Sequence, residues 1–286
     1  MTIALVHFLT ALVLAAAAVP ALLRARWVRR CPLTAVLTWH LVALTVPLSL
    51  IGALLTLGLT PYETGMPRAV LTAASELPTG RAPDGFTAWH ATPLLTALAL
   101  ATVLVAAVVT SALAARRTRH RHRDLLALVA RPEPGLPGVL VLDHPGPTAY
   151  CVPGRPPRMV VSAGALDALS RVELAAVLAH ERAHARERHH LALLPFAALR
   201  RLAPRWRAPE TIFAAVALLL EMRADDTARR TQPAEALATA LRRFDRQGAL
   251  DRLTGRAAGL PLAVRLLVLG TAATVAATPV SFFLPW

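Results

Sequence analysis

The chain has 286 residues, of which 55% are hydrophobic, and its mean hydropathy of +0.50 is high for a soluble domain. Its net charge of +14 is carried entirely by arginine, because the chain contains no lysine. The arginines cluster beside the apolar runs, which favours a membrane surface, and no basic stretch has interleaved aromatic residues. Direct nucleic-acid binding is therefore not expected. The two cysteines, Cys31 and Cys151, have no spacing typical of a zinc or redox pair.

Four apolar runs predict transmembrane helices, because a bilayer core about 30 Å thick requires about 18 or more mostly apolar residues. The first run is not typical of a signal peptide, since its positive charges follow the apolar residues instead of preceding them. The fourth is interrupted by Arg265 and Pro279. The runs are residues 3–23, about Leu33 to Leu59, about Pro93 to Ala115, and Leu260 to about Leu284.

The arginines beside these runs predict the orientation, because cytoplasmic loops carry an excess of positive charge. The loop at 60–92 holds only Arg68 and Arg81 against three acidic residues. This loop is therefore expected outside, together with both termini, and the first loop and the central domain are expected in the cytoplasm. The arginines of the cytoplasmic segments are Arg24, Arg26, Arg29 and Arg30 after the first span, and Arg116, Arg117, Arg119, Arg121 and Arg123 after the third.

Three regions follow from this pattern: a three-helix transmembrane region (1–115), a cytoplasmic domain (116–258) and a closing transmembrane helix (259–286). The cytoplasmic domain begins with a helix from Asp124 to about Arg131, which the run PEPGLPG breaks. The segments GVLVLDH, TAYCVPG and RMVVSAG then predict a small antiparallel sheet.

Two long helices are predicted after the sheet. Ser170 with Glu173 three residues later is typical of a capping box, and the helix that it begins continues through His190 without a breaker. The second helix is expected to start near Pro209, a residue favoured in the first turn. The segment LALLPFAALRRL between them is too short to span and is expected to be buried or to lie on the membrane surface.

The first of these helices carries the sequence HERAH. His180 and His184 are four residues apart and share one helical face, so both imidazoles can bind one ion, which the motif predicts to be Zn²⁺. Glu181 sits beside them, where it can take a proton from an attacking water molecule. A catalytic zinc needs a third protein ligand and one open position.

Glu221 is the best candidate for the third ligand, because a carboxylate directly after the apolar run VALLL is costly without a partner. Asp225 follows one turn later and could accept the second ring N–H of a ligand histidine. His189 and His190 lack the spacing of a ligand pair and sit among charges, so they are expected on the solvated surface.

The segments AAVLAHERAHARERHH and LLLEMRADDTA resemble the membrane-embedded zinc peptidases of the beta-lactam-receptor antirepressor (BlaR/MecR-like) family. More loosely they resemble the heat-shock and CAAX-processing membrane peptidases. The resemblance implies a mainly α membrane protein with a cytoplasmic α+β zincin-like domain. It also implies zinc ligands at His180, His184 and Glu221, a general base at Glu181, and Asp225 as the acid behind a ligand histidine.

The resemblance further implies that TAYCVPG is an edge strand that pairs with extended substrate, with contacts at Ala149 and Tyr150. Receptors of this family continue into an extracellular penicillin-binding sensor domain, whereas this sequence ends at Trp286. Any input is then expected to come through the 60–92 loop, the spans or a partner.

These features predict a membrane-bound zinc endopeptidase whose partners are the lipid bilayer and a protein substrate, with a cytoplasmic transcriptional repressor as the first candidate. A heat-shock-type protease for membrane-protein quality control is the alternative. A non-catalytic membrane signalling protein is a further one, which the intact Glu181 disfavours. A transporter would need polar residues within several spans, and here they are few.

Overall fold

The structure is a computed structural model that describes residues 2–244 and 259–279. Its backbone forms two compact units. The first comprises the described parts of 1–28, 34–107 and 260–286, and the second comprises those of 29–33 and 108–259. The expected domain boundaries after residues 115 and 258 stay predictions, and residue 258 lies outside the described part of the chain.

Three helical runs in the described chain are long and apolar enough to cross a membrane: Thr2–Arg24, α4 (Pro32–Gly58) and α6 (Ala88–Val129). They coincide with the first three predicted spans and indicate a membrane protein. In the first run, a π-helical turn, η1 (Leu14–Ala18), joins α1 (Thr2–Val13) to α2 (Val19–Arg24). The turn lies just before Pro20, which has no N–H to donate. The short helix α3 (Arg26–Arg30) follows.

The predicted fourth span corresponds in part to α14 (Leu262–Ala277), an apolar helix of 16 residues. At 1.5 Å per residue it is about 24 Å long, which is shorter than the roughly 30 Å of a bilayer core. The predicted span extended to about Leu284, and residues 280–284 lie outside the described residues. Four spans and the expected orientation therefore stay predictions.

The 60–92 connection folds into short helices: η2 (Thr60–Tyr62), α5 (Met66–Glu76) and η3 (Leu77–Thr79). Leu59, Tyr62, Ala69 and Ala73 form a small buried cluster at its centre. Leu55 of α4 and Leu94 of α6 also pack against this cluster, so the predicted outside loop is a packed element that joins the ends of these helices.

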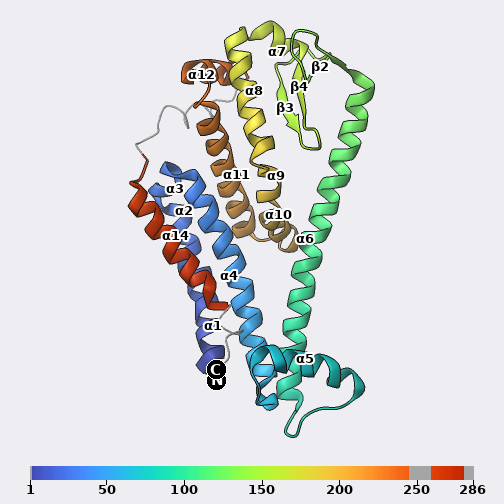
Figure 1. The fold of residues 1–286 in the computed structure, drawn as a ribbon, viewed down its shortest axis with the longest axis vertical. Helices are drawn as coiled ribbons and strands as arrows, with labels where there is room; N and C mark the ends of the chain where they lie inside the picture. Colours follow the sequence, from blue (N-terminus) through green and yellow to red (C-terminus); the bar gives the residue numbers. More distant parts are fainter. Residues whose placement is uncertain (1, 245–258, 280–286) are drawn as a thin grey trace. The chain divides into compact units, whose positions relative to one another are not determined.

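A four-stranded sheet forms in the second unit (Figure 1). Its strands are β1 (Ala130–Pro132), β2 (Val139–Leu142), β3 (Ala149–Val152) and β4 (Arg158–Ser162), in the order β1-β2-β4-β3. β1 and β2 are antiparallel, as are β3 and β4, but β2 and β4 are parallel. The prediction of a wholly antiparallel sheet is therefore wrong. The almost fully buried β4 is an inner strand next to β2, and the β3–β4 hairpin leaves β3 at the edge.

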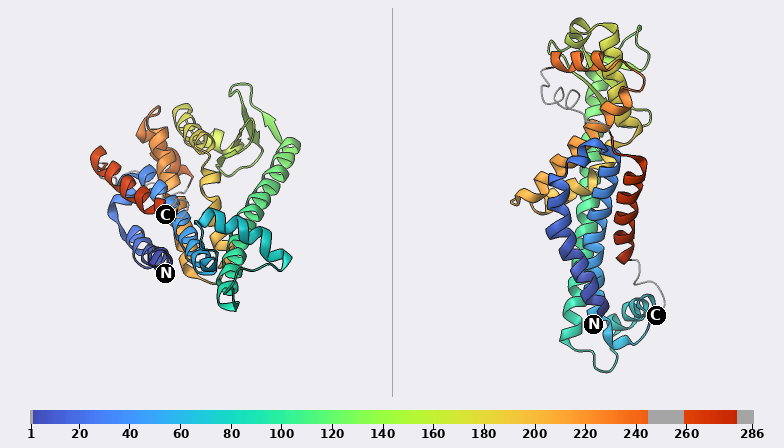
Figure 2. Two further views of the ribbon diagram at one scale, coloured as in Figure 1. Left: turned by 60° about the horizontal axis from the view of Figure 1, so that its bottom comes forward. Right: turned by 90° about the vertical axis from the view of Figure 1, so that its left-hand side faces the viewer.

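The two faces of this sheet pack on different helices, α8 (Arg171–Arg186) and the C-terminal part of α6 (Figures 1 and 2). Alternate residues Val139, Ala149, Met159 and Val161 pack with Leu174, Val177 and Leu178 of α8. Val152 and Val160 face the other way and pack on Leu126 of α6. α6 continues unbroken through the arginine-rich stretch, so the third predicted span and the helix predicted from Asp124 are one helix.

The capping box predicted at the start of α8 is present in full. The Ser170 hydroxyl accepts from the Glu173 N–H at 3.3 Å, and the Ser170 N–H donates to the Glu173 carboxylate at 2.7 Å. These bonds satisfy groups that a helix start leaves without intrahelical partners. The helix predicted to start near Pro209 is also present, as α11 (Arg207–Ala228). The remaining helices of this unit are α7 (Ala163–Ala168), α9 (His189–Ala192), α10 (Leu194–Leu202) and α12 (Ala234–Arg243).

The first long helix does not continue through His190, as the sequence had indicated. α8 ends at Arg186, and Arg188 adopts a left-handed conformation with φ of 52° before α9 begins. This conformation is uncommon for a residue with a Cβ and cannot be seen in a hydropathy pattern. After this break, His189 lies in a separate helix, where its ring contacts that of His184.

Candidate metal centre and active site

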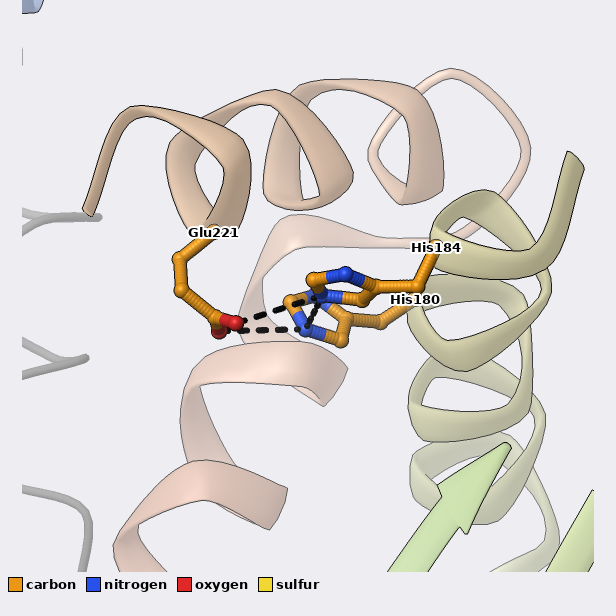
Figure 3. Close-up of side chains that lie close together, drawn as sticks. All are labelled: His180, His184 and Glu221. Carbon is orange, nitrogen blue, oxygen red and sulfur yellow. Dashed lines mark hydrogen bonds and ion pairs between the residues drawn. The ribbon is translucent and has the colours of Figure 1, made fainter. Parts of the chain in front are cut away.

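The site lies between α8 and α11 (Figure 3). α8 presents His180 and His184 from successive turns of one face, and α11 presents Glu221 opposite them. His180 is only 3% exposed, whereas His184 and Glu221 are half-buried. One ligand atom from each residue can be chosen so that all three lie within 4.8 Å of one another.

These three side chains fit a tetrahedral metal ion. The two Nε2 atoms are 3.2 Å apart, and the Glu221 carboxylate oxygens lie 3.4 Å from Nε2 of His184 and 3.6 Å from Nε2 of His180. Zinc bound at about 2.0–2.1 Å to tetrahedral ligands sets them about 3.3 Å apart. Two imidazole nitrogens and a carboxylate are also the donor set of catalytic zinc sites that keep a fourth position open. His180, His184 and Glu221 would therefore hold the ion.

Asp225 lies behind His180. Its carboxylate is 2.9 Å from Nδ1 of His180 and is 1% exposed. An N–H at Nδ1 that donates to this carboxylate leaves the lone pair of Nε2 directed at the metal position, which is the role expected of Asp225 from the sequence. Burial lowers the pKa of His180, but hydrogen bonds to Asp225 and Glu221 outweigh burial and raise the pKa to about 9.

Glu181 contacts the edge strand. Its Oε2 atom accepts a hydrogen bond of 3.2 Å from the backbone N–H of Cys151 in β3. The carboxylate of the HExxH motif thus joins α8 to β3. Burial, followed by the charge of Glu181, raises the pKa of the Cys151 thiol to about 11.

The sheet register shows which backbone groups of β3 point away from β4. Ser162 donates its N–H to the carbonyl of Thr148 at 2.8 Å, so Thr148 and, two residues on, Tyr150 turn their backbone groups toward β4. Ala149 and Cys151 therefore turn their N–H and carbonyl groups toward the open edge. The Ala149 side chain is buried against α8, and the Tyr150 hydroxyl lies 3.1 Å from Nε2 of His122 on the opposite face.

The second histidine is supported by a chain of polar groups that the sequence did not predict. Nδ1 of His189 lies 2.9 Å from Nδ1 of His184, and Nε2 of His189 lies 3.2 Å from the Glu187 carboxylate. His189 is 4% exposed, so its expected place on the solvated surface is wrong. Burial lowers the pKa of His189, which keeps this ring neutral at pH 7.

Glu187 joins this chain to α11. It accepts hydrogen bonds from Nε of Arg223 at 2.8 Å and from the hydroxyl of Thr227 at 2.7 Å. Burial raises the pKa of Glu187, but the bonds from Thr227, Arg223 and His189 outweigh burial and hold the pKa below its usual value. The only sequence signal for this arrangement is the density of polar residues after HERAH, which equally fits a solvated face.

A mainly helical unit with a small sheet, two histidines of an HExxH motif and a converging glutamate supports a zincin-like metallopeptidase. Residues 112–246 match the model of Peptidase family M48, and this range contains every predicted site residue. Peptidases of this family are metal-dependent, usually with zinc. No solved structure matches the chain significantly. The assignment to the beta-lactam-receptor family stays a prediction.

Proposed function

We propose that the protein is a membrane-bound zinc endopeptidase that hydrolyses peptide bonds of a cytoplasmic regulatory protein. One observation carries the proposal: His180, His184 and Glu221 converge on one point. Glu181 follows His180 directly in the sequence and is the carboxylate of the same HExxH motif. The family match over 112–246 and the three apolar helices support a metallopeptidase in a membrane.

The protein's own residues account for the proton transfers. Zinc held by His180, His184 and Glu221 would act as a Lewis acid that activates water and polarises the scissile carbonyl. Glu181 takes the proton from the attacking water and gives it to the leaving amine. Asp225 keeps the ring of His180 in the tautomer that leaves Nε2 free for the metal.

The open edge of β3 is the proposed binding surface for the substrate. An extended peptide can pair with a free strand edge through its main chain, and Ala149 and Cys151 offer their backbone groups there. Such pairing would bring a peptide alongside α8 at Glu181. Tyr150, which lies between Ala149 and Cys151 in β3, is proposed as a further contact to the substrate.

The proposed substrate is a repressor-like regulator, and the bilayer anchors the enzyme, with the peptidase domain in the cytoplasm and both termini outside. The resemblance of the HERAH and EMRADD segments to antirepressor peptidases supports this choice. Quality control of membrane proteins is the second candidate, because main-chain pairing on β3 would accept many extended sequences.

The test compares wild-type protein with Glu181→Gln, both purified in detergent without chelator, by metal analysis and cleavage of denatured casein. We expect about one zinc per chain in both proteins and cleavage by the wild type alone. Glu210→Gln, at an exposed glutamate on α11, is the matched control and should cleave like the wild type. Wild-type protein without zinc, or equal cleavage by Glu181→Gln, would refute the proposal.

The substrate class needs a separate experiment. New protein N-termini are compared between cells that express the wild type and cells that express Glu181→Gln. Cleavage of one DNA-binding regulator supports the first candidate. Cleavage of many misfolded membrane proteins supports quality control instead.

A further inference from the structure

A cavity of about 780 Å³ opens in the second unit between the C-terminal part of α6, the β3–β4 turn and the end of α8. This volume is within the range of ligand pockets, about 300–1,000 Å³. Its lining is unusually basic. Three of its arginines are spaced three and four residues apart on one face of α6, and the whole set is Arg116, Arg119, Arg123, Arg155, Arg186 and Arg188.

The positive charge of this cavity is not compensated by the described residues. No aspartate or glutamate is among the described residues that line it. Across the described ranges, the arginines with a carboxylate partner are Arg200, Arg223 and Arg243, none of which lines the cavity. Six like charges around one space repel one another, and a bound anion would remove that repulsion.

His190 adds a polar group to the same wall. Its Nδ1 atom is buried and has no hydrogen-bond partner among the residues that the structure describes. Burial lowers the pKa of His190, and the charges of Arg119 and Arg188 lower it further. The wall of the cavity thus holds a histidine ring beside the arginines, and the buried Nδ1 atom of this ring does not face the open space.

The cavity walls are held in place by specific contacts. The Arg123 guanidinium donates to the carbonyl of Pro156 at 3.1 Å, and Arg158 donates to the carbonyl of Arg123 at 3.2 Å. These bonds join the β3–β4 turn to α6. The Arg123 guanidinium also lies directly against Gly154 of that turn. The fold therefore positions Arg123, one of the arginines of the cavity, against the β3–β4 turn.

The position of these arginines along α6 indicates the source of the anion. Arg116 directly follows the apolar stretch that ends at Ala115. At 1.5 Å per residue, the α6 arginines extend over about 10 Å of the helix axis. Each headgroup region of a bilayer is about 5–8 Å deep. A membrane-spanning α6 therefore places this cavity at the level of the lipid headgroups.

We propose that this cavity is a binding site for a phosphate-bearing anion, and that its ligand is the headgroup of an anionic phospholipid. Arginine suits this ligand because its planar guanidinium pairs with phosphate oxygens through two parallel hydrogen bonds. The site goes beyond the proposed peptidase activity and does not depend on it.

The experiment uses the full-length protein in detergent at one fixed ionic strength, with binding followed by microscale thermophoresis. Dioctanoyl phosphatidic acid is the probe, dioctanoyl phosphatidylcholine is the zwitterionic control, and glycerol 3-phosphate represents a soluble phosphate. The test variant is Arg119→Gln with Arg186→Gln. The matched control is Arg117→Gln with Arg121→Gln, which removes the same charge from exposed positions of α6 outside the cavity.

We expect the wild type to bind phosphatidic acid at least tenfold more tightly than phosphatidylcholine or glycerol 3-phosphate. The test variant should lose at least tenfold in affinity, and the control should stay within about twofold. Equal loss in both variants would show unspecific attraction to a basic helix and overturn the site. Glycerol 3-phosphate binding as tight as that of phosphatidic acid would overturn the lipid assignment. Absence of binding in every arm would overturn the proposal.

A folding defect in the test variant is recognised by its zinc content and thermal unfolding, compared with the wild type. Arg155→Gln, on the exposed β3–β4 turn, then replaces it. It should weaken phosphatidic acid binding by about three- to tenfold, and an unchanged affinity would count against the site.

Discussion

Nδ1 of His189 lies 2.9 Å from Nδ1 of His184, whereas Nε2 of His184 faces Glu221 at 3.4 Å. If Nε2 of His184 is a metal ligand, its proton must lie on Nδ1 and be donated to His189. His189 must then carry its own proton on Nε2 and donate it to Glu187, 3.2 Å away. One set of tautomers satisfies the whole chain, so these residues fix both the orientation and the protonation state of His184.

Replacing His189 by alanine is therefore expected to weaken zinc binding about 10- to 100-fold, as loss of a group behind a metal ligand typically does. His189→Asn should recover part of this loss, because its amide oxygen can accept from His184. Competition with a chromogenic chelator measures the affinity, and thermal unfolding of the zinc-free protein separates this effect from a general loss of stability. An affinity of His189→Ala within twofold of wild type would contradict the positioning role.

Asp225→Ala is expected to leave Nδ1 of His180 buried without the carboxylate that lies 2.9 Å from it. Such a group costs about 1–3 kcal/mol of stability, and zinc affinity should fall about 10- to 100-fold. Chemical denaturation in detergent and chelator competition measure the two quantities. Asp226→Ala, at the neighbouring position of α11, is the control and should change zinc affinity less than threefold. Equal effects of the two substitutions would argue against a specific Asp225–His180 bond.

Ser170→Ala removes the hydroxyl that accepts from the Glu173 N–H at the start of α8. The expected loss is about 1 kcal/mol of unfolding free energy, in the range of other N-cap substitutions. Zinc content should not change, because the ligands lie three turns further along the helix. Thr211→Ala, on an exposed face of α11, should cost less than about 0.5 kcal/mol. A Ser170→Ala protein as stable as wild type would show that the capping box contributes little.

Alkylation of Cys151 reports on its surroundings. Its pKa is raised from 9.0 to about 11, so at pH 8 the reactive thiolate is about 100-fold scarcer than for an ordinary thiol. Iodoacetamide labelling of a Cys31→Ala protein should be about that much slower in the folded state than in denaturant. Glu181→Gln removes a negative charge that raises the pKa and should speed the reaction. Labelling unaffected by folding would contradict the buried position of Cys151.

Much of this architecture could be predicted from the sequence, because the signals are local. Ser170 and Glu173 mark the start of α8, the HERAH spacing places His180 and His184 on one face, and the apolar run before Glu221 makes an isolated carboxylate there costly. The structure brings the side chains of His180, His184 and Glu221 together, and their role as zinc ligands stays a prediction.

What could not be predicted depends on non-local packing or on one backbone angle. The parallel pairing of β2 with β4 joins strands that β3 separates in the sequence, and no residue pattern within either strand encodes it. The left-handed conformation of Arg188 ends α8 early and turns His189 inward. A helix continued through His190 puts His189 on a charged face, which is why the sequence indicated a solvated position.

The hydrogen bond between Cys151 and Glu181 has a consequence for the order of events at this site. The free edge of β3 offers the Cys151 N–H to a single acceptor, and the Glu181 carboxylate holds it in this structure. A peptide carbonyl that docks on Cys151 must displace that carboxylate. Under the proposed function, docking of the peptide on Cys151 would therefore also release Glu181 from the strand, so one N–H would both receive the substrate and free the proposed base.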